Sequence, residues 1–176
     1  MGYAKPHGAV SGTQVQHHSS VIGHTPNMGE DAMDRSTKAT DTFDKGFNCS
    51  QSVLTAFSGE LGLGEQEALR IACGFGGGMG RTAKTCGAVS GAFMVIGLKY
   101  GQTRGDDKAS KEKTYALIKQ FSDLFAKAYG SVECRELLPH DISTPEGLQS
   151  AQEQGLFKTL CPKYVAGAVK ILDGIL

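Results

Sequence analysis

The sequence predicts an all-α fold, a single-domain bundle of about five to seven helices with an irregular N-terminal tail. Apolar residues recur at helical spacing from Asp41 onward, no segment alternates apolar and polar residues as a half-buried strand does, and no internal repeat is visible. We therefore expect a tail over residues 1–40 and an all-helical domain over 41–176. The chain of 176 residues is long enough for such a domain to bury a core.

Residues 1–40 are rich in Gly, Ser, Thr and His and poor in large apolar side chains, with no helical or strand period. Four of the five histidines lie here: His7, His17, His18 and His24. The tail is interpreted as a flexible or partner-ordered arm, with weak metal binding as the alternative.

Two helices are predicted before a glycine-rich segment. Apolar residues mark one face of a first helix around 53–61, which ends in the LGLG stretch at 61–64, and a second short helix runs from Glu65 to about Gly74. The next segment, GFGGGMGR at 74–81, is too rich in glycine for a regular element. A loop is predicted there.

The central helix of the bundle is predicted directly after Cys86. Its sequence, GAVSGAFMVIGL, is apolar nearly all round, as is typical of a helix surrounded by others. At roughly 13 residues it is too short to cross a bilayer. Its Gly87, Gly91 and Gly97 would weaken an isolated helix, but they suit a backbone that neighbouring helices approach closely.

Four further helical segments complete the domain. The clearest amphipathic helix covers residues 106–129 and is stopped by Gly130. A short turn over VECRELL and a brief helix around 148–156 follow it. The last helix opens at Cys161-Pro162, where a proline without an N–H fits the first turn.

The composition excludes several classes of protein. Eighteen Lys and Arg balance eighteen Asp and Glu, so net charge gives no reason to expect nucleic acid or an anionic membrane surface as a partner. The opening residues lack the apolar run of a signal peptide, so a cytoplasmic protein is expected. Five cysteines in such a compartment favour metal binding or reversible thiol chemistry over a fixed disulfide framework.

Four cysteines share a position at or near a predicted helix start: Cys49, Cys86, Cys134 and Cys161. A helix N-terminus stabilises the thiolate, the form of cysteine that attacks electrophiles and binds metals, so we expect lowered thiol pKa values. Their wide separation excludes a local CxxC pair, a zinc knuckle and the CxxCH of covalent haem, so a joint site has to be built by tertiary structure. The alternative is simple core filling. Cys73, near the end of its helix, is interpreted as core packing.

The glycine segment does not match a phosphate-binding loop, because it lacks the third glycine of GxGxxG and the lysine of a P-loop. We expect instead that Gly76, Gly77, Gly78 and Gly87 let the backbone pass close to a cofactor or disulfide at Cys86, offering N–H donors to sulfur.

Three other side chains are candidates with equally ordinary alternatives. Arg81 or Lys84 could add positive charge beside a thiolate, or both could be solvated. His140 could be a further ligand or proton carrier, although a lone histidine in a loop is usually neither.

Four segments carry a family resemblance: FNCSQSVLTAF at 47–57, FGGGMGRTAKTCGAVSGAFMVIGLKYG at 75–101, CRELL at 134–138 and CPKYVAGA at 161–168. They resemble the C_GCAxxG_C_C family of small helical redox-active proteins, which is named for four cysteines and a CGAxxG motif, here Cys86 to Gly91. The resemblance covers about residues 41–176. It implies that Cys49, Cys86, Cys134 and Cys161 form the functional set and that Cys73 lies outside it.

The resemblance has two further implications. The family is similar to part of the split-Soret cytochromes, but this chain has no CxxCH, so covalent haem is not implied. Family members often lie near transporter genes, which implies a transport-associated redox partner.

Four functions stay open at this point. The first is an electron-transfer protein or oxidoreductase with an iron–sulfur cluster on the four cysteines, since Cys₄ is the usual ligand set of such clusters. The second is a metal-free dithiol/disulfide protein. The third is a binding module held together by structural zinc, and the fourth is a small-ligand carrier. The glycine-rich helix faces and the apolar C-terminus, Ile175-Leu176, suggest a homodimer.

Overall fold

The computed structural model describes residues 34–176, and the predictions for the histidines of the tail lie outside this range. The described residues are helical, apart from connecting segments and one isolated bridge between Thr85 and Glu133. The elements are α1 (Arg35–Asp44), α2 (Cys49–Ser58), α3 (Glu65–Ala72), the 3-10 helix η1 (Cys73–Phe75), α4 (Gly76–Met79), α5 (Gly87–Tyr100), α6 (Lys108–Tyr129), α7 (Cys134–Leu137), α8 (Pro145–Glu153), α9 (Leu156–Thr159) and α10 (Cys161–Ile175). The predicted all-α fold is confirmed.

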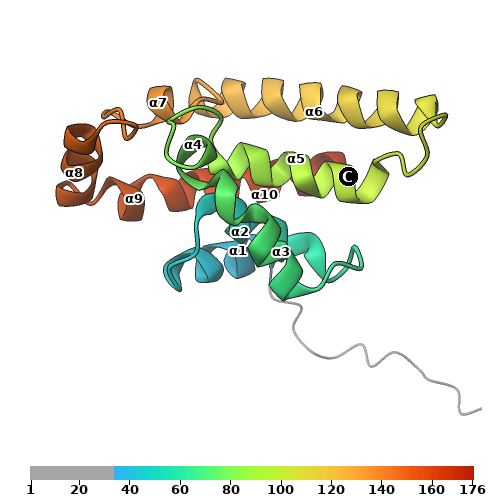
Figure 1. Cartoon of the computed structure of the whole chain (residues 1–176), viewed down its shortest axis with the longest axis horizontal. Coiled ribbons are helices and arrows are strands. Elements are labelled where there is room, and N and C mark those ends of the chain that lie inside the picture. The colour runs from blue at the N-terminus through green and yellow to red at the C-terminus, as the bar shows by residue number, and fades with distance from the viewer. Residues whose placement is uncertain (1–33) are drawn as a thin grey trace, which may run out of the picture. The chain divides into compact units, whose positions relative to one another are not determined.

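Helix α5 lies at the centre of the packing, as predicted from its apolar sequence. It contacts α2, α6 and α10, and Figure 1 shows α6 running alongside it. Val89, Val95 and Ile96 are fully buried in α5, and Phe121 and Phe125 of α6 pack with them in one core. A helix apolar on all sides needs such neighbours, because each exposed face would otherwise leave apolar surface in water.

Helix α2 is buried along its whole length, although its sequence indicates only one apolar face. Apart from Gln51, its polar side chains are small, and Thr55 satisfies its hydroxyl by donating to the carbonyl of Gln51 at 2.8 Å. Gly91 of α5 faces Ser50 and Val53, so the two backbones approach closely. Small residues on both helices therefore allow α2 to be buried without the large apolar face by which a buried helix is normally recognised in a sequence.

Helix α1 begins at Arg35, ahead of Asp41, where the periodic sequence suggested that the domain begins. Arg35 donates to Glu60 at 3.0 and 2.5 Å and to Asp173 at 2.5 Å. These ion pairs tie α1 to the segment after α2 and to α10. Few large apolar residues are available in α1, so surface charges and small buried residues hold it in place.

The glycine segment forms a left-handed turn rather than a regular right-handed helix. Gly77, Gly78, Met79, Gly80 and Arg81 all have φ between 61° and 67°. The left-handed region costs a non-glycine residue about 1–2 kcal/mol, so Met79 and Arg81 hold strain. The loop predicted from the glycine content is present in this form, and its backbone closes through the amide of Gly80 donating to Gly76 at 2.9 Å.

Candidate functional site

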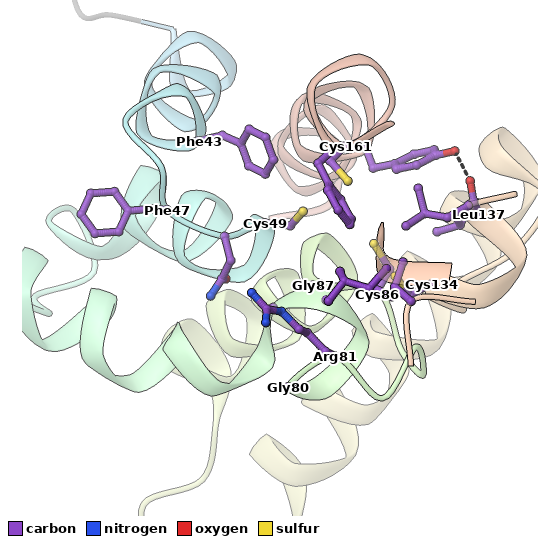
Figure 2. A pocket seen from close by; sticks show the side chains of 18 of the residues that line it. Phe43, Phe47, Cys49, Gly80, Arg81, Cys86, Gly87, Cys134, Leu137 and Cys161 are labelled. Carbon is purple, nitrogen blue, oxygen red and sulfur yellow. Dashed lines mark hydrogen bonds between the residues drawn. The ribbon is translucent and has the colours of Figure 1, made fainter. Parts of the chain in front are cut away.

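The four cysteines from helix starts line one cavity of about 580 Å³ (Figure 2). Cys49 is the first residue of α2, Cys134 the first of α7 and Cys161 the first of α10, while Cys86 directly precedes α5. Each of the four is buried. Tertiary structure therefore brings together residues that the sequence separates widely.

Cys49 is positioned by a capping box at the start of α2. The Asn48 side chain accepts from the amides of Ser50 and Gln51, both at 3.0 Å, and the Gln51 side chain accepts from the Asn48 amide at 2.9 Å. This arrangement satisfies amides that a helix start otherwise leaves free. It fixes the point at which the chain turns into α2, and thus the position of Cys49.

Cys86 and Cys134 are held as neighbours by a short stretch of backbone pairing. The Cys86 amide donates to the Val132 carbonyl at 2.8 Å, and the Cys134 amide donates to the Lys84 carbonyl at 2.7 Å. These bonds flank the bridge between residues 85 and 133. No sequence pattern predicted this pairing, because each strand-like piece is too short to show a period.

The predicted glycines bring the backbone against the cysteines. A Cβ on Gly78 would lie 2.7 Å from the Cβ of Cys134, and one on Gly87 would lie 3.0 Å from the Cβ of Cys49. Gly76, Gly77 and Gly87 line the cavity itself. Gly78 does not line the cavity but contacts Cys134, so its small size lets that cysteine and the glycine turn pack together.

Burial decides the protonation of most of these thiols. Loss of hydration raises the pKa of Cys86 to about 11, although its sulfur accepts from the amides of Ala88 and Val89. Loss of hydration also raises the pKa of Cys134 to about 12. The expectation that a helix start lowers each thiol pKa is wrong for these two cysteines, because desolvation outweighs the helix end.

The ionisation of Cys49 and that of Cys161 influence each other. The neighbouring Cys49 thiol lowers the pKa of Cys161, whereas the neighbouring Cys161 thiol, together with burial, raises the pKa of Cys49 well above its ordinary value. The expected lowering therefore holds for Cys161 alone among the four. Among the four buried thiols, Cys161 is the one whose pKa is lowered.

The remaining candidates divide between the rim and the surface. Arg81 lines the cavity, whereas Lys84 and His140 are not among its lining residues. Cys73 is exposed and lines the same cavity, so its interpretation as core packing is wrong. The segment after α3 is a 3-10 turn open to solvent rather than a continuation of the buried helix face, which explains the difference.

Sequence reasoning missed the apolar wall of the cavity. Phe43, Phe47, Phe157 and Tyr164 line it, and Tyr164 donates from its hydroxyl to the Leu137 carbonyl at 2.9 Å. Tyr164 follows Cys161 by three residues on α10, which places it on the same helix face and was a usable signal. The phenylalanines come from separate segments, and only tertiary structure assembles them.

The four buried thiols around the cavity are donors of a kind that metal ions and iron–sulfur clusters take. Across residues 34–176, no three or more His, Cys, Asp or Glu side chains are grouped closely enough to hold one metal ion. The predicted zinc tetrahedron therefore gains no support from this arrangement. A cluster carries its irons at separate corners, so its thiolates need not meet at one point, and the cavity leaves room between them.

The chain was compared with family models, curated proteins and solved structures. A family model described as "Putative redox-active protein (C_GCAxxG_C_C)" matches residues 47–175, which include every cysteine of the cavity. The chain belongs to the C_GCAxxG_C_C family. No curated protein and no solved structure matches this C_GCAxxG_C_C chain. None of its described helices is both long and apolar enough to cross a membrane.

Proposed function

We propose that this C_GCAxxG_C_C protein is an electron-transfer protein whose cavity holds an iron–sulfur cluster on Cys49, Cys86, Cys134 and Cys161. The observation that carries the proposal is the convergence of four buried thiols, from four helix starts, on one cavity. Four cysteine thiolates are the standard ligands of [2Fe–2S] and [4Fe–4S] clusters. When bound, the cluster supplies one-electron transfer.

The protein's own groups account for the other needs of such a centre. The amides of Ala88 and Val89 donate to the Cys86 sulfur and would stabilise negative charge there. The apolar wall lines the cavity beside the sulfurs, and Gly87 allows the start of α5 to approach Cys49. Hydrogen bonds and burial of this kind are the levers by which a protein sets a cluster's potential.

Anaerobic purification of the full chain tests the proposal. We expect brown protein with about two or four irons per chain, matched by acid-labile sulfide, and absorption that bleaches on reduction. Cys86→Ser should lower the iron content strongly, whereas Cys73→Ser should leave it unchanged, because Cys73 lies outside the ligand set. Colourless, iron-free wild-type protein would overturn the proposal.

A second function is favoured by Cys49 and Cys161, which line the same cavity and shift each other's pKa in opposite directions. In a dithiol mechanism, the Cys161 thiolate attacks one sulfur of a substrate disulfide and the other substrate sulfur leaves as a thiol. Cys49 then attacks the Cys161 sulfur and releases the second substrate thiol. The two cysteines end as a disulfide, having given two electrons and two protons to the substrate.

Thiol counting by mass spectrometry separates the two functions. Under the dithiol mechanism, a small disulfide such as oxidised dithiothreitol or cystine oxidises metal-free protein with a loss of two hydrogens, and peptide mapping links Cys49 to Cys161. Cys161→Ser should abolish that loss, and Cys134→Ser should not. A linkage between other cysteines would contradict this assignment.

The cytoplasmic location, a transport-associated partner and a homodimer stay predictions from the sequence and its resemblance.

A further inference from the structure

The cavity has two ends of different character. The four thiols Cys49, Cys86, Cys134 and Cys161 are buried, with 4–8 % of their surface exposed. Other lining residues are exposed or half-buried and form a rim: Phe43, Phe47, Cys73, Arg81, Gln152 and Phe157. A volume of about 580 Å³ falls within the range of roughly 300–1,000 Å³ that small-molecule sites occupy. The space is thus large enough for an organic ligand that reaches from the rim toward the sulfurs.

Among the described residues that line the cavity, Arg81 is the one that carries a fixed charge. Apart from the cysteines, the lining consists of glycine, apolar and aromatic residues, Asn48 and Gln152, with no carboxylate among them. Within residues 34–176, the Arg81 guanidinium has no ion pair and no hydrogen-bond acceptor. Figure 2 shows its side chain extended at the edge of the pocket. An unpaired guanidinium beside an apolar wall presents five donors to an anion.

The backbone holds Arg81 at this rim in a conformation that glycine would prefer. Its φ is 66°, and its amide donates to the Gly76 carbonyl at 3.3 Å. The Arg135 guanidinium donates to the carbonyls of Thr82 and Ala83 at 3.2 and 3.3 Å, which anchors the chain just after it. Strained residues of this kind persist where the surroundings over-determine them, and they gather at binding sites.

We propose that the rim of the cavity binds a small organic anion, with its apolar body against the aromatic wall and its anionic group on Arg81. The ligand class is an apolar carboxylic or sulfonic acid, positioned with its far end toward the four thiols. This site goes beyond the redox function proposed above, and it does not require that a cluster be present.

Two fluorescent probes of nearly equal shape test the proposal on the full chain. 8-Anilinonaphthalene-1-sulfonate carries one negative charge, and N-phenyl-1-naphthylamine is its uncharged counterpart. Arg81→Gly should weaken binding of the anionic probe by about tenfold or more, the range expected for a lost charge-assisted hydrogen bond. Binding of the uncharged probe should change less than twofold. Arg81→Lys should retain part of the preference for the anion.

Met79→Gly is the matched control. Met79 has a φ of 67° in the same turn and does not line the cavity. Each glycine variant removes the backbone strain of a non-glycine residue in the left-handed region, so both should melt at a higher temperature than the wild type. Only Arg81→Gly should lose the anionic probe. Equal loss in the two variants, or unchanged binding in both, would overturn the proposal.

Alkylation of the rim cysteine gives a second readout. If the anionic probe occupies the cavity, it should slow the reaction of Cys73 with N-ethylmaleimide in the wild type and not in Arg81→Gly. An unchanged Cys73 rate with saturating probe would place the probe elsewhere and contradict the proposal. Iron content, which reports on the proposed cluster, should be the same in the wild type and in Arg81→Gly, so the two proposals fail separately.

Discussion

The four buried thiols of this protein are each subject to two competing physical effects. A helix N-terminus favours the thiolate by a few tenths to about 1 kcal/mol. Burial in an apolar cavity disfavours it by more, and the pKa values of Cys86 and Cys134 rise to about 11 and about 12. Cys161 departs from this trend because the neighbouring Cys49 thiol lowers its pKa. Proximity to a helix start is thus a poor guide to the reactivity of a thiol unless the burial of its sulfur is also known.

Cys73 should be the first thiol to react in the native, metal-free, reduced protein. It is exposed, whereas the other four cysteines are buried, so a maleimide reaches it without any opening of the fold. We expect one fast-reacting thiol per chain in a time course followed by intact mass. The other four should react only after denaturant unfolds the protein. Cys73→Ser should remove the fast phase, and two or more fast thiols in the wild type would contradict the expectation.

At the scale of the elements, the contact between α2 and α5 supports the site. Cys49 begins one helix and Cys86 precedes the other, so the spacing of these two helices sets the distance between their first residues. Gly91 makes the close approach possible, because a Cβ there would lie 2.8 Å from the Ser50 carbonyl oxygen and 3.0 Å from the Cβ of Val53. The glycines of α5 therefore contribute to the fold and to the placement of the cysteines.

Gly91→Ala should lower the free energy of unfolding by about 1–3 kcal/mol, the usual cost of overpacking a core. Gly97→Ala, in the same helix, is the control: no atom lies within 4 Å of its added Cβ, so it should raise stability by about 0.5–1 kcal/mol. Urea unfolding followed by circular dichroism measures both. Equal effects of the two substitutions would show that α2 and α5 do not meet at Gly91.

At the scale of the whole molecule, the cavity couples the fold to the state of its thiols. Four helix starts surround it, so a charge that forms inside acts on several elements at once. In the metal-free reduced protein, burial keeps Cys86 and Cys134 protonated at neutral pH. A bound cluster would instead require them as thiolates, so cofactor binding would release protons.

The metal-free reduced protein should lose stability as the pH rises from about 9 toward 11 and 12. A thiol whose pKa is 9 when unfolded and about 11 when folded binds its proton more tightly in the folded state, so its contribution is complete below pH 9 and vanishes above 11. Cys134 extends the window to about 12. The lowered pKa of Cys161 acts in the opposite direction.

Denaturant midpoints measured at several pH values check this expectation. Cys86→Ala removes one of the titrating thiols and should lose less stability than the wild type between pH 9 and 11. A wild-type protein whose stability falls no faster than that of Cys86→Ala over this range would contradict the assigned protonation.

Much of the architecture was predictable because it rests on local patterns. Helical spacing predicts the all-α fold, the apolar sequence after Cys86 predicts the central helix, and Asn48 is a recognisable cap. The four cysteines at helix starts could also be identified from the sequence, since capping residues and proline mark helix starts within a few residues. Helix α2 was only partly predictable, because its burial rests on small polar residues that a hydrophobic pattern does not register.

The sequence by itself determined the helical class, the family and the placement of four cysteines at helix starts, because each depends on residues close together in the chain. Tertiary structure alone decided that these cysteines line one cavity, that Cys73 shares its rim, and that Arg81 is the one fixed charge among the described residues around it. It also decided the protonation of the thiols, because desolvation is a property of the assembled surroundings and not of a residue's neighbours in sequence.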